Sequence, residues 1–283
     1  MAPTLRAGSA DPSVEKAWVA AWTPVLASAV LGSVLTIAGI SVYVRFFRRF
    51  PTSDAVRPVV LAERRWIKGV VTRQVVRKRN RKKGDIVGDG DNFRLYHTPG
   101  PLWSKFRRVP DTSKELQNKT IHIRLSAVDA PEAGHFGRPP QPYASEAIAW
   151  LKSLIQGRRV HCQLVRRDQY GRIVANVHLP PRILPSPLFT GKNVSYEMIR
   201  AGWATAYLQS GAEYGAIGKE GFLKAEADAK AARRGMWAKG LSVETPAEYK
   251  RRFASDPIKG GAQVPQTTER TTGFLRNLWP WRS

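Results

Sequence analysis

The longest uninterrupted apolar stretch of the chain lies near its N-terminus. No residue from Ala17 to Val44 is charged, and the twenty residues Val25–Val44 would span about 30 Å as a helix, enough to cross a bilayer. Its polar residues are scattered, whereas a buried core helix would show a polar stripe. A secretory signal would have a basic leader, but Asp11 and Glu15 precede this segment. The pattern predicts a transmembrane helix at residues 25–44.

Basic residues gather on the C-terminal flank of this predicted span. Arg45, Arg48 and Arg49 follow it directly, whereas the first seventeen residues contain only Arg6 and Lys16 as bases. Positive charge near a span tends to stay on the side from which insertion occurs. We therefore expect a single-pass membrane protein whose bulk lies on the cytosolic or matrix side.

A period-two alternation begins at about residue 121. In the sequence TIHIRLSAV, apolar positions such as Ile121 and Ile123 alternate with polar ones such as Arg124, which is typical of a half-buried strand. Two further strands are predicted at residues 159–165 and 172–178.

Three segments show the period of amphipathic helices, and each ends at a glycine. They span residues 144–155, 194–201 and 220–234. Strands first and helices interspersed later indicate an α+β domain in which a small β-barrel has helices packed beside it. After Phe253 no periodic pattern survives, and we expect a flexible tail there.

The charge balance points to a polyanionic partner. The 283 residues include 46 Lys and Arg against 22 Asp and Glu, a formal net charge of +24. Nucleic acid is the first candidate, because neutralised phosphates release condensed counterions, and an anionic membrane surface is the second. Seven bases and no acid lie between Arg73 and Lys83, which predicts a solvated loop or a strand edge facing phosphate or lipid.

Cysteine and histidine usage excludes several kinds of site. The single cysteine, Cys162, rules out an internal disulfide framework and a Cys-rich zinc site. It alternates with Val160 and Leu164, so we expect a buried apolar residue. The five histidines show no H-E-x-x-H or other metal spacing, and zinc is not predicted.

Three short clusters could carry chemistry. Asp89-Gly90-Asp91 places two carboxylates around a glycine, which suits a hard cation such as Ca²⁺ but also describes an ordinary β-turn. Arg124 and the run Asp129-Ala130-Pro131-Glu132 could converge on a phosphate or form a structural ion pair at a strand end. Asp168-Gln169-Tyr170-Gly171-Arg172 reads as a hairpin turn that delivers a second arginine.

Together these clusters resemble a known family. In this order they match the D-G-D, R-L, V-D-x-P-E and D-x-Y-G-R motifs of the staphylococcal nuclease family, and the likeness covers roughly residues 85–238. Each motif alone is commonplace, but four in order are specific. With its leading span, the chain is similar to the fungal membrane-anchored branch of that family, which is assigned to mitochondria.

The resemblance implies an OB-fold-type five-stranded β-barrel with three helices and a calcium-dependent endonuclease acting on DNA or RNA. It implies that Asp91, Asp129 and the backbone carbonyl of Ala130 bind Ca²⁺, with Asp89 as an outer ligand. It further implies three catalytic residues: Glu132 as the general base, and Arg124 and Arg172 as clamps on the phosphate. Tyr170 would contact the phosphate or nucleotide, or serve in packing.

The sequence departs from the family pattern at a few positions. Asn92 stands where a threonine is usual, and Ala130 replaces a common threonine at a ligand that is only a carbonyl. Neither change should abolish metal binding. The stretch ahead of Asp89, where the family has its first strand, is dominated by the bases of residues 77–83, so the first strand is not defined by the sequence.

The expected organisation has five parts. They are an N-terminal segment 1–24, a transmembrane helix 25–44, a basic linker 45–84, a nuclease-like domain 85–238, and a C-terminal helix with a flexible tail 239–283. We expect a monomer. Two other functions stay open: a non-catalytic nucleic-acid-binding module, and a membrane scaffold that acts by charge alone.

Overall fold

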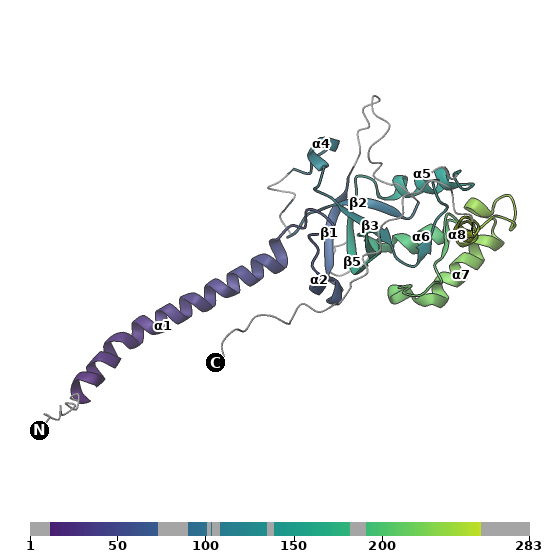
Figure 1. The fold of residues 1–283 in the computed structure, drawn as a ribbon. Coiled ribbons are helices and arrows are strands. Elements are labelled where there is room, and N and C mark those ends of the chain that lie inside the picture. The colour runs from purple at the N-terminus through teal and green to yellow at the C-terminus, as the bar shows by residue number, and fades with distance from the viewer. Residues whose placement is uncertain are drawn as a thin grey trace, which may run out of the picture.

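The computed structural model describes residues 12–72, 90–100, 103, 108–134, 139–181 and 191–255. Asp89, the basic run at residues 73–83 and the predicted tail beyond residue 255 lie outside the described residues. The described part consists of a long N-terminal helix and a β-barrel that carries further helices on the side away from it (Figure 1).

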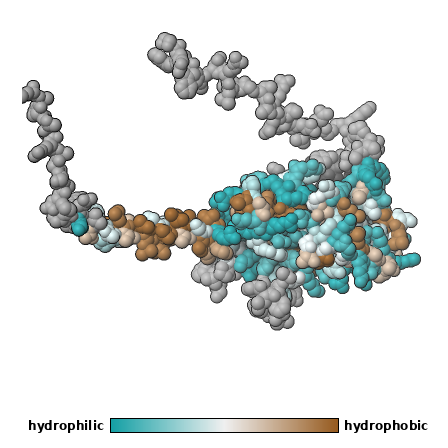
Figure 2. All heavy atoms as spheres, turned by 90° about the horizontal axis from the view of Figure 1, so that it is seen from below, coloured by the Kyte–Doolittle hydropathy of each residue, from teal (hydrophilic) through white to brown (hydrophobic). Residues whose placement is uncertain are grey.

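The N-terminal helix projects from the barrel as a single apolar rod. It comprises α1, Pro12–Val42, and a π-helical end, η1, Tyr43–Phe47. The segment Ala20–Phe47 is long and apolar enough to cross a membrane, and the side chains along it are almost all exposed. Figure 2 shows this hydrophobic rod beside a largely hydrophilic domain. Length and composition alone would equally suit an N-terminal signal sequence.

Five strands close into a barrel. In the order of their hydrogen bonding these strands are β3 (Ile121–Leu125), β2 (Asn92–His97), β1 (Trp66–Val71), β5 (Arg159–Arg167) and β6 (Ile173–Leu179). The neighbours pair antiparallel, and a parallel pairing of β3 with β6 completes the circle. This closed barrel confirms the predicted fold class. The short strand β7, Lys192–Asn193, extends the sheet beyond β6.

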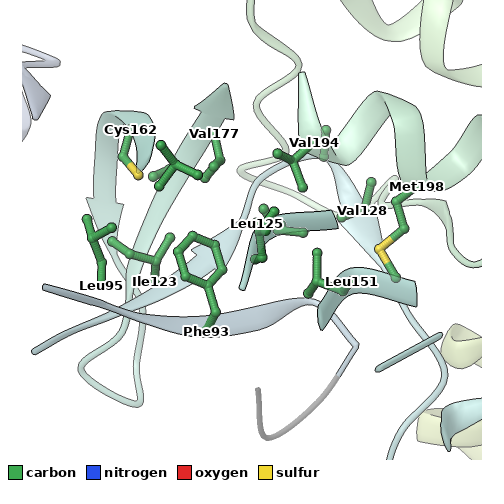
Figure 3. Packing of buried hydrophobic residues seen from close by; sticks show 14 of the residues in the cluster. Phe93, Leu95, Ile123, Leu125, Val128, Leu151, Cys162, Val177, Val194 and Met198 are labelled. Carbon is green, nitrogen blue, oxygen red and sulfur yellow. The ribbon is translucent and has the colours of Figure 1, made fainter. Parts of the chain in front are cut away.

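The alternating pattern of the strands fills the barrel interior. Ile121, Ile123 and Leu125 are buried, and the intervening His122 and Arg124 face outward. Side chains from neighbouring strands and from the adjoining helices meet in this core, as Figure 3 shows. Cys162 is among them and is fully buried, as predicted. Period-two burial therefore places alternate residues of β3 on the outside of the barrel, where they are half-buried.

The helices away from α1 gather on one side of the barrel (Figure 1). The three predicted ones are α5 (Ala144–Ile155), α6 (Val194–Arg200) and α7 (Gly218–Ala231). The last helix of the described residues, α8, covers Pro246–Ser255. Shorter elements are α2 (Pro58–Ala62), α4 (Ser113–Leu116), η2 (Gly215–Ile217) and η3 (Gly235–Trp237). Two two-residue strands, β4 (Val128–Asp129) and β8 (Thr205–Ala206), pair outside the barrel sheet.

The barrel begins earlier than the predicted boundary at residue 85. Its first strand, β1, lies inside the range 45–84 that the sequence placed in a basic linker. Ile67 and Val71 point into the core, and Phe50 and Val60 are buried as well. The strand is short and contains a lysine, so its alternation becomes recognisable only when its partners β2 and β5 are in place.

The residues that directly follow the N-terminal helix contact the barrel through a hydrogen bond and stacked side chains. The amide of Phe50 donates to Nδ1 of His97 at 2.9 Å, and the two rings stack with centroids 5.1 Å apart. The guanidinium of Arg49 lies 4.0 Å from the ring centroid of Tyr96. Burial, assisted by Arg49 and other cations, lowers the pKa of His97 to about 3, so its Nδ1 stays available as an acceptor. No free linker separates helix and domain.

Candidate active site

The turn between β3 and β4 brings the chain back to the end of the barrel. Ala127 adopts a left-handed conformation with φ of 64°, which reverses the chain after Leu125. Asp129 then pairs with Thr205 of β8, whose hydroxyl donates to the Asp129 carbonyl at 3.3 Å. This pairing fixes the backbone of Asp129 and returns its carboxylate to Arg124.

One guanidinium joins two buried carboxylates. Nη2 of Arg124 lies 3.1 Å from Oδ2 of Asp91 and 3.4 Å from Oδ1 of Asp129. The side chains of Asp91 and Asp129 are only 5% and 4% exposed. Asp91 is held next to Arg124 because the amide of Leu125 donates to its carbonyl at 2.8 Å. D-G-D and R-L, two motifs separated in the sequence, thus form one ion cluster.

Burial and charge act on this cluster in opposite directions. Burial favours the neutral forms, so it lowers the pKa of Arg124, but Asp91 and Asp129 more than offset that effect and leave the pKa raised. Burial also raises the pKa of Asp129, which Lys250 and Arg124 counteract only in part. Nearby positive charge is therefore required to stabilise the ionised form of Asp129 at this depth.

Gly90 is required by close packing beside Asp91. A Cβ added there would lie 2.8 Å from Cβ of Ala130 and 3.3 Å from Cβ of Ala147. The glycine therefore allows the segment that carries Asp91 to approach the segment that carries Asp129. Glycine is required at position 90 because a side chain would clash with these neighbours, and not because the backbone is left-handed there.

The third acidic residue, Glu132, is hydrogen-bonded to Gln141 and paired with a lysine. Two hydrogen bonds to Gln141 fix the backbone of Glu132. The Glu132 amide donates to Oε1 of Gln141 at 3.2 Å, and the Glu132 carbonyl accepts from the Gln141 amide at 2.9 Å. The ammonium of Lys250 lies 2.9 Å from Oε1 of Glu132 and 2.6 Å from Oδ1 of Asp129. We call Asp91, Asp129 and Glu132, with Arg124 and Lys250, the carboxylate site.

Lys250 is the site residue that sequence reasoning missed. It lies on α8, whose first turn is capped reciprocally: Thr245 Oγ1 accepts from the Glu248 amide at 3.3 Å, and the Glu248 carboxylate accepts from the Thr245 amide at 2.8 Å. The hydroxyl of Tyr249 donates to the carbonyl of Pro139 at 2.6 Å and fixes the helix beside the site. The cap Thr-x-x-Glu is visible in the sequence, but the reach of the lysine is not.

Arg172 stands apart from the carboxylate site and is bonded within its own hairpin. Its Nε lies 2.6 Å from Oδ2 of Asp168. Burial raises the pKa of Asp168, yet the hydrogen bonds and charge of Arg172 outweigh it and hold the pKa below its usual value. Tyr170 is 74% exposed, and its ring centroid lies 5.2 Å from the Arg172 guanidinium carbon. The D-x-Y-G-R hairpin thus presents an arginine and an open aromatic ring together.

The barrel register connects the two arginines. Arg124 pairs with Val174 across the parallel β3–β6 ladder, so Arg172 lies two residues from the partner of Arg124. His122, two residues before Arg124 on β3, has its Nε2 3.1 Å from Oδ1 of Asn92. Burial first, and then Arg94 and Arg172, lower the pKa of His122 to about 4. The ring is therefore neutral at physiological pH, and the charge of Arg172 acts on a residue that lies two positions from Arg124.

The donor chemistry of the carboxylate site suits a hard cation. Asp91 and Asp129 offer buried carboxylate oxygens, and Ca²⁺ takes about six to eight oxygen ligands from carboxylates, backbone carbonyls and water. Among the described residues, no three His, Cys, Asp or Glu side chains form a metal cluster by themselves. The Lys250 ammonium already provides positive charge between Asp129 and Glu132. The residues would fit a calcium ion if backbone and solvent supplied its remaining ligands.

Substitution of Gly90 tests the contact that brings Asp91 and Asp129 together. Gly90→Ala is expected to destabilise the fold by about 1–3 kcal/mol, because the new methyl group overlaps Ala130 in a packed region. Thermal unfolding of the full-length protein measures the loss. The double variant Gly90→Ala/Ala130→Gly removes the clashing Cβ and should recover part of the stability. Equal stability of Gly90→Ala and the unsubstituted protein would contradict the packing account.

Comparison with known proteins agrees with this geometry. Residues 122–239 match the family model described as staphylococcal nuclease homologue. The chain is 50% identical over 262 residues to "Probable endonuclease LCL3" of Schizophyllum commune, which covers 91% of this chain and 85% of the relative. It is 39% identical over 259 residues to "Probable endonuclease lcl3" of Talaromyces marneffei, which covers 84% and 71%. The closed barrel, the ordered motifs and these matches agree: the chain belongs to the staphylococcal nuclease family.

Proposed function

We propose that this protein is a calcium-dependent endonuclease that hydrolyses phosphodiester bonds of DNA or RNA and is tethered to a membrane by its N-terminal helix. The observation that carries the proposal is the Arg124 guanidinium placed between the carboxylates of Asp91 and Asp129. Family membership and the printed name of the relatives, probable endonuclease, support the reaction class. The net charge of +24 supports a nucleic acid substrate.

In this proposal the side chains divide the work of phosphate hydrolysis. Arg124 and Arg172 bind the phosphate oxygens through planar guanidinium groups and neutralise the negative charge that grows in the transition state. Glu132 takes a proton from the attacking water. Asp91, Asp129 and the Ala130 carbonyl would hold Ca²⁺, which would supply further positive charge at the phosphate. Tyr170, exposed beside Arg172, offers a ring on which a base can stack.

A purely structural or nucleic-acid-binding role explains the site less well. A non-catalytic module needs basic surface but has no use for three acidic residues gathered around Arg124 and Lys250, because acidic residues repel a phosphate backbone. A scaffold that acts by charge alone leaves the buried cluster unexplained, because burying paired charges is costly and unnecessary for a diffuse field. Both alternatives predict a protein that binds nucleic acid without cutting it.

The membrane tether is supported by the way the helix joins the domain. Phe47 ends the candidate span, and Phe50, three residues later, is already buried in the barrel. Cleavage of this segment as a signal would have to occur close to residues that the barrel core uses. A permanent anchor in a mitochondrial membrane, with the domain on the matrix or cytosolic side and the protein a monomer, is part of the proposal.

Three single substitutions test the catalytic assignment. Glu132→Gln should lower kcat by roughly 10²–10⁴-fold, the usual contribution of a general base, with little change in KM. Arg124→Lys and Arg172→Lys keep the charge but lose the planar fork, so each should cost about 3–5 kcal/mol in kcat/KM. Steady-state cleavage of single- and double-stranded DNA and of RNA, with calcium or a chelator, provides the measurement. Chelation should abolish cleavage.

The control for these variants is Arg200→Lys, because Arg200 is paired with Glu197 on α6 and is not part of the site. A diffuse basic field would make all three arginine variants equally active. Full turnover by either Arg124→Lys or Arg172→Lys would remove that arginine from catalysis, and undiminished cleavage with a chelator would remove calcium. Circular dichroism establishes that each variant is folded.

Deletion of residues 1–44 tests the tether. The truncated protein keeps Phe50 and the rest of the barrel core, so it should remain folded and become extractable from membranes by alkaline carbonate. The full-length protein should resist extraction. If the full-length protein is extracted as readily as the truncated one, or has already lost its N-terminus in cells, the helix is not a membrane anchor.

A further inference from the structure

A lysine on α8 contacts two carboxylates of the carboxylate site. The Lys250 ammonium lies 2.6 Å from Oδ1 of Asp129 and 2.9 Å from Oε1 of Glu132. These are the residues that the proposed function assigns to metal binding and to water activation. We propose that Lys250 is an internal counter-ion of the carboxylate site that calcium must displace, so that α8 restrains the site until the metal binds. This inference rests on the proposed function.

The charges of the site explain why an internal cation is needed. Asp91, Asp129 and Glu132 carry three negative charges, and the Arg124 guanidinium contacts only the two aspartates. Lys250 on α8 contacts both Asp129 and Glu132 and so adds a second positive charge to the site. The lysine therefore allows the three acidic residues to lie close together before a metal arrives.

Calcium and Lys250 compete for the same oxygen. Calcium binds carboxylate oxygens at about 2.3–2.6 Å. A calcium ion on Oδ1 of Asp129 would therefore stand within about 5 Å of an ammonium that lies 2.6 Å from that same atom. A divalent and a monovalent cation at that separation repel strongly inside a protein. Occupation by one cation thus disfavours occupation by the other.

The Lys250 side chain is exposed enough to move from the site into solvent. Its side chain is 36% exposed, whereas that of Asp129 is 4% exposed. The four-carbon stem can turn the ammonium toward solvent while Tyr249 keeps α8 attached through its hydrogen bond to Pro139. The release of Lys250 consequently removes the ammonium from Oε1 of Glu132 and does not require the barrel to change.

Calcium binding by the full-length protein in detergent, followed by isothermal titration calorimetry, tests this competition. Lys250→Gln should bind calcium at least about tenfold more tightly than the unsubstituted protein, because the competing charge is gone. The neighbouring Arg251→Gln removes the same charge from the same helix and should change the affinity by less than about threefold. Lys250→Met, which keeps the apolar stem, should behave as Lys250→Gln and replaces it if that variant does not fold.

A second measurement follows the helix itself. Amide hydrogen exchange in α8 of the unsubstituted protein should become faster when calcium is added, since the helix loses an ion pair to the site. In Lys250→Gln calcium should leave that exchange unchanged. Faster exchange confined to the unsubstituted protein supports displacement, and equal exchange with and without calcium in both proteins argues against it.

The outcomes separate this inference from the proposed function. Equal calcium affinities in the unsubstituted protein and Lys250→Gln would overturn the competition and leave calcium binding intact. Absence of calcium binding from both would overturn the calcium assignment and this inference together. If the unsubstituted protein cleaves nucleic acid in a chelator and Lys250→Gln does not, the lysine takes the place of the metal permanently, and the displacement model is wrong.

Discussion

The arrangement of the site depends on the ion pairs that the buried Arg124 guanidinium makes with Asp91 and Asp129. An unpaired charge at this depth would be costly, and removal of one member of a buried pair typically destabilises a protein by about 3–5 kcal/mol. The pairs draw the segment before β2 and the turn after β3 to the same end of the barrel. The close packing at Gly90 and the pairing of β4 with β8 stabilise that arrangement. The same two carboxylates are the proposed calcium ligands, so in this proposal one pair of residues serves both the fold and the chemistry.

Much of the fold could be predicted because the periodic segments are long or clearly bounded. The alternation around Ile121 and Ile123 identifies β3, and glycines mark the ends of the three principal helices. β1 could not be predicted in the same way. Trp66–Val71 is short and lies between basic residues, and its burial arises only from pairing with strands distant in the sequence. The predicted linker therefore contains part of the barrel, and the N-terminal helix joins the domain directly.

The candidate site shows a similar division. Arg124 and Asp129 could be placed together from their spacing, since a strand and a tight turn bring nearby residues back to one edge, and the family resemblance added Asp91. Lys250 could not, because it is 121 residues from Asp129 in the sequence and lies beyond the recognised domain. A capped helix can be predicted from residues 245–248, but which carboxylate its lysine reaches depends on how α8 packs against Pro139. Tertiary docking, rather than any local pattern, supplies the fifth residue of the site.

The central claim is that Asp91 and Asp129 form a cation site within a folded barrel, and the calcium dependence of thermal unfolding tests it most directly. A ligand that binds only the folded state stabilises it by about 2.7 kcal/mol at a concentration of 100 times Kd. The account predicts that calcium raises the Tm of the full-length protein by several degrees, that Asp91→Asn and Asp129→Asn abolish the rise, and that Asp111→Asn, at an exposed position, retains it. An equal rise in all four proteins, or no rise in the unsubstituted one, would contradict the account.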